Sequence, residues 1–230
     1  MIKAILCDFN GVIIDDELIQ HRAYREVFAP LGIDVTDEMY YARLGMDDKS
    51  FVGSILTEAG RESDTDTILN LTAAKTSYWR AIVMENLPLF PGIENFLRKM
   101  AREFTLGIVS MAKREEIDFV LEAAGISSLF QVIISAETVT KYKPNPECYR
   151  IGFREIDAAR IGDGHLPMTH QECLVIEDTP AGVLAARAAD LPVLAVHNTV
   201  PAVEMRKAGA AAVANYLDDW MPDSIRRVFA

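Results

Sequence analysis

The sequence predicts an α/β fold, in which a doubly wound parallel sheet carries a four-helix cap inserted after its first strand. Short apolar runs typical of buried strands recur along the chain, and helical patterns separate most of them. Strands that alternate with helices are typical of a parallel sheet covered on both faces. The exception is the stretch 15–88, which contains helical patterns and no convincing strand.

Six apolar runs are predicted to form the sheet. They are Ala4–Cys7, Thr105–Val109, Gln131–Ile134, Cys173–Ile176, Val193–Val196 and the weaker Ala211–Val213. Between them, Lys113–Ala124 places its apolar residues on one helix face, and Ala181–Ala189 follows Thr179-Pro180, a helix-start signal. Residues 1–14 and 89–230 are therefore predicted to form a Rossmann-like core.

The stretch 15–88 is predicted to form the helical cap. Linkers at Ile14–Glu17 and Asn86–Pro91 would join it to the core. Its four helical patterns are His21–Leu31, Thr36–Leu44, Ser50–Ala59 and Asp66–Glu85.

Composition limits the classes of function. The 230 residues are half hydrophobic, enough for a packed core, and the formal net charge of −11 disfavours nucleic acid as a partner. No apolar run approaches the ~20 residues that span a bilayer, and the N-terminus enters a strand without a leader pattern. The odd set Cys7, Cys148 and Cys173 lacks zinc spacing and indicates reduced thiols in a cytoplasmic protein. We expect a monomer.

Polar residues follow four of the predicted strands. These residues are Asp8, Ser110, Lys143 and the pair Glu177-Asp178. The carboxyl ends of parallel strands share one edge of the sheet, where open α/β sheets bind ligands, so these groups should converge. Carboxylates suit Mg²⁺, which prefers oxygen ligands, and a lysine with a serine hydroxyl suits a phosphoryl group.

Four segments, in this order, resemble the haloacid dehalogenase superfamily, in its β-phosphoglucomutase-like subgroup with a helical cap. They are Asp8-Phe9-Asn10-Gly11-Val12 with Asp16-Glu17, Ile108-Val109-Ser110, Lys143-Pro144-Asn145-Pro146-Glu147, and Ile176-Glu177-Asp178-Thr179-Pro180-Ala181-Gly182-Val183. The resemblance implies a Mg²⁺-dependent phosphatase or phosphomutase that acts on a small phosphorylated metabolite.

The resemblance also implies a role for each matching residue. Asp8 would be the nucleophile that forms an aspartyl-phosphate, and a ligand of Mg²⁺. Ser110 and Lys143 would bind the transferred phosphoryl group, with Gly11 in the same substrate-binding loop. Asp178 would bind the metal, supported by Glu177, directly or through water. The backbone carbonyl of Asn10 would be a further metal ligand.

Asn10 departs from the family pattern, in which an aspartate two residues after the nucleophile protonates the leaving group and activates water. An amide cannot shuttle a proton at ordinary pH, and acid–base help is typically worth ~10²–10⁴ in rate. We therefore expect slow hydrolysis of the aspartyl-phosphate. Asn10 is also compatible with an engineered substitution that traps a complex.

Five cap residues are candidates for contact with substrate. The resemblance favours His21 near the hinge, and Arg43, Gly45 and Lys49 around a loop between cap helices, where the family places specificity residues. Lys75, on the last cap helix, could also meet substrate.

Three alternatives to a phosphatase or phosphomutase stay open. Dehalogenation would not need Mg²⁺, so Glu177-Asp178 disfavours it. Cleavage of a carbon–phosphorus bond would require a Schiff-base lysine, for which Lys49 and Lys75 are the candidates. A non-catalytic phosphate-binding protein is favoured by Asn10.

Overall fold

The six predicted strands form one parallel sheet in the computed structural model, which describes residues 1–230. The sheet order is β3-β2-β1-β4-β5-β6. Successive strands therefore run outward from β1 in one direction and from β4 in the other, and the ends of β1 and β4 mark the switch point where such sheets bind ligands. The strands are β1 (Ala4–Cys7), β2 (Thr105–Val109), β3 (Phe130–Ile134), β4 (Cys173–Glu177), β5 (Val193–Val196) and β6 (Ala212–Ala214).

Helices cover both faces of the sheet because side chains along each strand alternate between the faces. In β1, Ile5 and Cys7 join one apolar cluster, while Ala4 and Leu6 join the other. The first cluster packs against α5 (Ile93–Ala101), α6 (Arg114–Ala123) and α10 (Pro222–Val228), and the second against α7 (Glu147–Gly162), α8 (Pro180–Ala188) and α9 (Ala202–Ala208). The predicted doubly wound core is confirmed.

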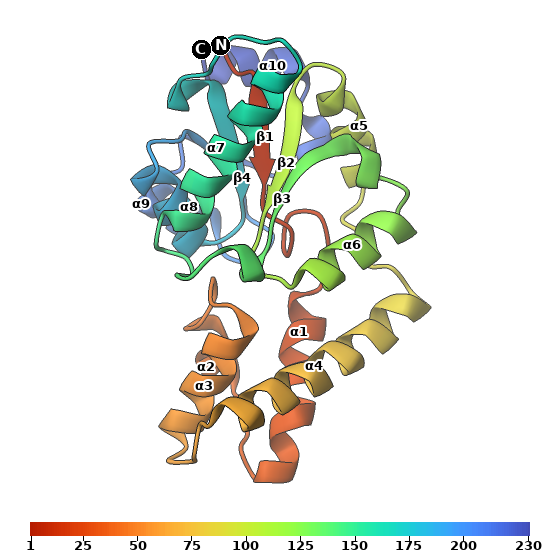
Figure 1. Cartoon of the computed structure of the whole chain (residues 1–230), viewed down its shortest axis with the longest axis vertical. Helices are drawn as coiled ribbons and strands as arrows, with labels where there is room; N and C mark the ends of the chain where they lie inside the picture. The colour runs from red at the N-terminus through yellow and green to blue at the C-terminus, as the bar shows by residue number, and fades with distance from the viewer.

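The cap helices lie beyond the carboxyl ends of the strands, at the opposite end of the molecule from both termini (Figure 1). They have a small apolar core of their own, which includes Tyr24, Phe28 and Phe51. The cap helices are α1 (Glu17–Phe28), α2 (Asp37–Tyr41), α3 (Asp48–Glu58) and α4 (Thr65–Glu85), with a 3₁₀ turn at Ala29–Leu31. No helix of the chain combines the length and the apolar character needed to cross a membrane.

The two linkers between core and cap run side by side. The Asp15 N–H donates to the Pro88 carbonyl at 2.6 Å, and the Phe90 N–H donates to the Ile13 carbonyl at 3.2 Å. These bonds tie the entry and exit of the cap together as one hinge. The domain boundaries at 15 and 88 remain a prediction.

Candidate active site

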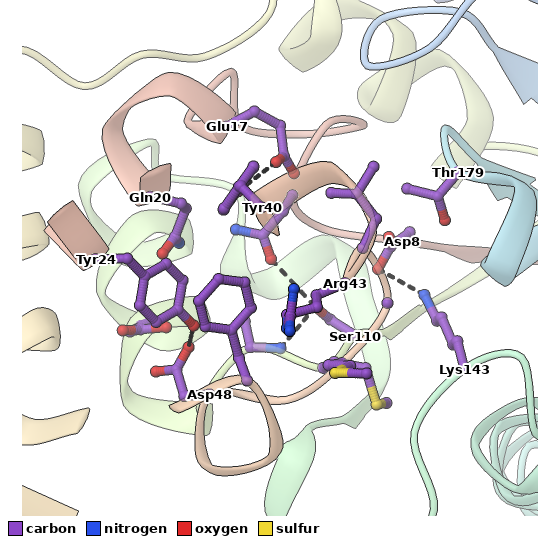
Figure 2. Close-up of a pocket in the computed structure, with 18 residues that line it drawn as sticks. Asp8, Glu17, Gln20, Tyr24, Tyr40, Arg43, Asp48, Ser110, Lys143 and Thr179 are labelled. Atoms are coloured by element: carbon purple, nitrogen blue, oxygen red, sulfur yellow. Dashed lines mark hydrogen bonds and ion pairs between the residues drawn. The ribbon is translucent and has the colours of Figure 1, made fainter. Parts of the chain in front are cut away.

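The predicted polar residues meet at the carboxyl edge of the sheet. Asp8 directly follows β1, Ser110 follows β2, and Glu177 ends β4. A pocket between this edge and the cap has Asp8 and Lys143 on one side and Gln20, Tyr24 and Asp48 on the other (Figure 2). The pocket is lined by Asp8, Asn10, Glu17, Gln20, Tyr24, Tyr40, Arg43, Leu44, Gly45, Met46, Asp48, Phe51, Ser110, Met111, Ala112, Glu116, Lys143 and Thr179.

Lys143 is held between two acids. Its Nζ lies 3.0 Å from Asp8 Oδ1 and 2.6 Å from Glu177 Oε1. Burial disfavours the charged form of the lysine, but the charges of Asp8 and Glu177 outweigh this and raise its pKa. Lys143 is therefore a fixed cation beside the carboxylate of Asp8.

Glu177 serves this arrangement from behind the pocket. One carboxylate oxygen accepts from Lys143 and from the Tyr149 hydroxyl, at 2.6 and 2.8 Å. The other oxygen accepts from the backbone N–H groups of Asp178 and Thr179, at 3.0 and 3.1 Å. The backbone at Gly182 leaves room for this carboxylate, which a Cβ there would overlap. Both oxygens accept hydrogen bonds, and through one of them Glu177 supports Lys143.

Asp178 presents an unused oxygen. Its Oδ1 is buried without a hydrogen-bond partner, while Oδ2 accepts from the Thr199 hydroxyl. Gly11 packs directly against this carboxylate with φ of +72°, and a Cβ at that position would overlap Asp178. Gly11 therefore gives the acid its space and the turn its left-handed conformation.

The acids at this edge fit a divalent cation. Oxygens of Asp8, Glu177 and Asp178 lie within 4.8 Å of one another, and Lys143 offsets only one of the three charges. Burial, opposed by Lys143, raises the pKa of Asp8 to about 7, and burial with the charges of Glu177 and Asp8 raises that of Asp178 well above its usual range. The donor set is all oxygen, which suits Mg²⁺, and the orphaned Asp178 oxygen is an available ligand.

The raised pKa of Asp8 predicts how metal-free stability depends on pH. The pKa rises from 3.8 to about 7 on folding, so between these values the folded chain holds a proton that the unfolded chain has released. Stability of the metal-free protein should therefore fall as pH rises through this window, by on the order of 4 kcal/mol in total.

Mg²⁺ held by these acids would require them ionised, so the increase in melting temperature that it causes should be larger at pH 8 than at pH 5. Thermal melts at both pH values, with Mg²⁺ or with a chelator, measure this difference. In the Asp8→Asn variant, most of this difference between the two pH values should disappear. If Mg²⁺ raised the melting temperature of the unaltered chain equally at both pH values, the acids at this edge would not be the groups that bind the cation.

Asn10 and Ser110 face the pocket beside Asp8. The Ser110 hydroxyl accepts from the backbone N–H of Ala112 at 3.0 Å, and its oxygen lies 3.5 Å from the Asn10 amide oxygen. The Asn10 NH₂ group turns away, toward Asp16. Position 10 therefore presents an amide acceptor beside the hydroxyl donor of Ser110, in place of an acid.

Two predicted cap residues, Arg43 and Gly45, reach the pocket. The Arg43 guanidinium donates to the Ser54 hydroxyl and the Met39 carbonyl, and it forms an ion pair with Glu58. Gly45, with φ of +92°, packs on the core so closely that a Cβ there would lie 3.2 Å from that of Lys143. Arg43 is thus committed to partners within the cap, and Gly45 permits contact of cap and core.

The other three cap candidates do not line the pocket. His21 is buried, with Nε2 2.8 Å from the Val35 carbonyl and its ring stacked on Tyr40. One residue is a turn of about 100° on a helix, so Gln20 faces the pocket instead. Lys49 is exposed. The structure thus disagrees with the prediction that His21 and Lys49 face substrate.

Lys75 also differs from the prediction. It is buried in the cap, and its Nζ lies 3.0 Å from Asp48 and 3.5 Å from Glu116. The acids, not the lysine, line the pocket. Lys75 therefore neutralises a charge cluster from behind, because a buried charge requires partners.

Glu17 lines the pocket, although the sequence did not mark it as a site residue. Its carboxylate accepts from the Tyr40 hydroxyl at 2.5 Å. Burial, together with the charge of Asp16, raises its pKa to about 7. The only signal in the sequence was its place in the Asp16-Glu17 pair after the first motif.

Comparison with known proteins relates the chain to a family of hydrolases. The profile of the haloacid dehalogenase-like hydrolases matches residues 5–196. The chain is 25% identical over 193 residues to validoxylamine A 7'-phosphate phosphatase of Streptomyces hygroscopicus, covering 83% of this chain and 84% of that protein. It is 29% identical over 220 residues to SUPPRESSOR OF QUENCHING 1 of Arabidopsis thaliana, with 92% of this chain covered, but it spans only 19% of that protein's length.

Solved structures agree in fold. The β-phosphoglucomutase of Clostridium difficile has a TM-score of 0.84 at 23% identity, covering 100% of this chain and 97% of the other. A mutant of CbbY from Rhodobacter sphaeroides, in complex with xylulose-(1,5)bisphosphate, has a TM-score of 0.79 at 26% identity, covering 95% and 96%. With the profile match across most of its length, the chain belongs to the haloacid dehalogenase-like hydrolase family.

Proposed function

We propose that the protein is a Mg²⁺-dependent phosphatase that acts on a small phosphorylated metabolite through an aspartyl-phosphate on Asp8. One observation carries the proposal: Asp8 lies in the pocket 3.0 Å from a buried lysine, with Asp178 close enough to share a cation. This arrangement supplies a nucleophile, a fixed positive charge and a metal site at one point. The validoxylamine and CbbY relatives, which are described with phosphorylated small molecules, support the substrate class.

In the proposed reaction, a carboxylate oxygen of Asp8 attacks phosphorus, and the bond to the leaving oxygen breaks with its electrons going to that oxygen. Lys143 and the Ser110 hydroxyl hold the phosphoryl oxygens, and the cap excludes water. Asp8, Asp178 and the carbonyl of Asn10 would hold Mg²⁺, which supplies positive charge to offset repulsion between the carboxylate and the phosphate. The leaving oxygen takes a proton from solvent. Water then attacks phosphorus, the bond from phosphorus to Asp8 breaks and restores the carboxylate, and inorganic phosphate leaves while the proton of the water passes to solvent.

Hydrolysis of the aspartyl-phosphate should be the slow step of this reaction. The residue at position 10 accepts hydrogen bonds but cannot take a proton from water. Phosphoryl transfer to a second hydroxyl of a sugar, as in a phosphomutase, would use the same Asp8. Cleavage of a carbon–phosphorus bond is less well supported, because Lys75 is buried between acids with a raised pKa and is a poor amine nucleophile.

The charges of the cap predict a preference for monophosphates. The pocket is lined by carboxylates of Glu17 and Asp48 from the cap and of Glu116 from α6 of the core, while Arg43 and Lys75 are paired with acids. A second phosphate would face these carboxylates without a free cation. We expect kcat/KM for glucose 6-phosphate to exceed that for fructose 1,6-bisphosphate by about tenfold or more. Equal values, or the reverse order, would show that the paired cations are released to bind substrate.

The proposed function is tested with a panel of sugar and other small monophosphates, by phosphate release in Mg²⁺ and in a chelator. We expect weak, metal-dependent turnover, with a burst of leaving group equal to the enzyme concentration. Binding of phosphate esters with no burst and no turnover would favour the non-catalytic alternative.

A further inference from the structure

Asp16 is a buried acid that the proposed reaction does not use. It stands at the hinge, immediately before α1, and is fully buried. Its carboxylate accepts from the Asn10 amide at 3.0 Å on each oxygen, from Gln20 Nε2 at 2.8 Å and from the Trp79 indole N–H at 2.7 Å. The core loop and two cap helices therefore all donate to one carboxylate.

This carboxylate fixes how Asn10 is turned. The carboxylate accepts from Asn10, Gln20 and Trp79, so the amide directs its NH₂ group to Asp16 and its oxygen to the other side. On that side lies the Ser110 hydroxyl, at 3.5 Å. Since that hydroxyl already accepts from the Ala112 N–H, its own hydrogen is available to the Asn10 oxygen or to a phosphoryl oxygen.

We propose that Asp16 is a positioning residue, which holds Asn10 as a hydrogen-bond acceptor at the reaction centre. The two residues form a matched amide–carboxylate pair. An acid at position 10 would instead bring two carboxyl groups about 3 Å apart and would remove the amide donor that now satisfies Asp16. Asn10 is thus consistent with the rest of this sequence and is not an isolated loss of an acid.

The pair also affects the lifetime of phosphorylated Asp8, a consequence that rests on the proposed function. Position 10 supplies no proton and removes none, and Asp16 cannot replace it because its oxygens are occupied and buried. The phosphorylated form of Asp8 should therefore persist.

The pair is tested by Asn10→Asp, Asp16→Asn and the combined exchange, with Asp15→Asn as the control because Asp15 is an exposed neighbouring acid. Thermal melts come first. The melting temperature of each single variant should fall by roughly 5 °C or more. Asn10→Asp leaves two acids facing each other, and Asp16→Asn leaves two amides. The combined exchange restores one acid and one amide, and should recover more than half of the loss.

The second readout is the decay of the phosphorylated chain after removal of the phosphoryl donor. The combined exchange places an ionised acid at the reaction centre, held by the amide at position 16. Its decay rate should rise by about 10²-fold or more and acquire a pH dependence that the unaltered chain lacks. In the Asn10→Asp variant alone, the increase in decay rate should be smaller by a factor of about ten or more. Its new acid shares a proton with Asp16 and is therefore a weaker base.

The outcomes separate this inference from the proposed function. Additive losses of melting temperature, or equal decay in Asn10→Asp and the combined exchange, would overturn the role of Asp16. Coupled melting temperatures with no phosphorylation of any variant would support the pair and refute the proposed phosphatase.

Discussion

Replacing Asp8 with Asn is expected to abolish phosphoryl transfer, with a loss of at least about 10⁴-fold in the rate of leaving-group release. The amide keeps the shape of the side chain but is not a nucleophile. It also removes one ligand and one charge from the proposed metal site, so Mg²⁺ affinity should fall. Rapid-quench measurement of the first turnover checks this result.

Asp15→Asn is the matched control for this variant. It makes the same chemical change seven residues along, at an exposed side chain, and should keep the burst unchanged. A normal burst in Asp8→Asn would mean that another group receives the phosphoryl group.

Replacing Lys143 with Met is expected to have the largest effect on stability. Lys143 is buried between Asp8 and Glu177, and its removal leaves two acids without a cation. Breaking a buried pair from one side typically costs about 3–5 kcal/mol, which denaturant unfolding of the metal-free protein would detect. Phosphoryl transfer should fall as well, because the fixed charge beside Asp8 is lost.

Lys141→Met provides the comparison, since the Lys141 side chain is exposed two residues away. It should change stability by less than about 0.5 kcal/mol. Equal effects of the two substitutions would show that the contact of Lys143 with the acids is not what stabilises the site.

Most of the sheet could be predicted from sequence because each strand is a short apolar run. Ala4–Cys7 and Thr105–Val109 coincide with β1 and β2. The convergence of the polar residues was predictable for a related reason. Parallel strands bring their carboxyl ends together, so Asp8, Ser110 and Asp178 meet at one edge without knowledge of any side-chain contact.

The cap side of the site could not be predicted in the same way. His21 and Gln20 are neighbours in sequence, and only the rotation of α1 decides which of them lines the pocket. Lys75 has partners 27 and 41 residues away, at Asp48 and Glu116, which no local pattern indicates. Long-range ion pairs of this kind depend on how the cap packs against the core.

The role of Asp16 was hidden for the same reason. Its partner Trp79 lies 63 residues further along the chain, on α4. From sequence alone, Asn10 therefore looked like a missing acid. In the structure it is one member of a hydrogen-bonded pair.

We propose that Asp8 becomes phosphorylated when Mg²⁺ is bound between it and Asp178. Intact-mass measurement after exposure to acetyl phosphate, with Mg²⁺ or with a chelator, tests it most directly. We expect one added phosphoryl group, mapped to Asp8, only when Mg²⁺ is present, and none in the Asp178→Asn variant. Phosphorylation that proceeds equally with the chelator, or that maps to another residue, would contradict it.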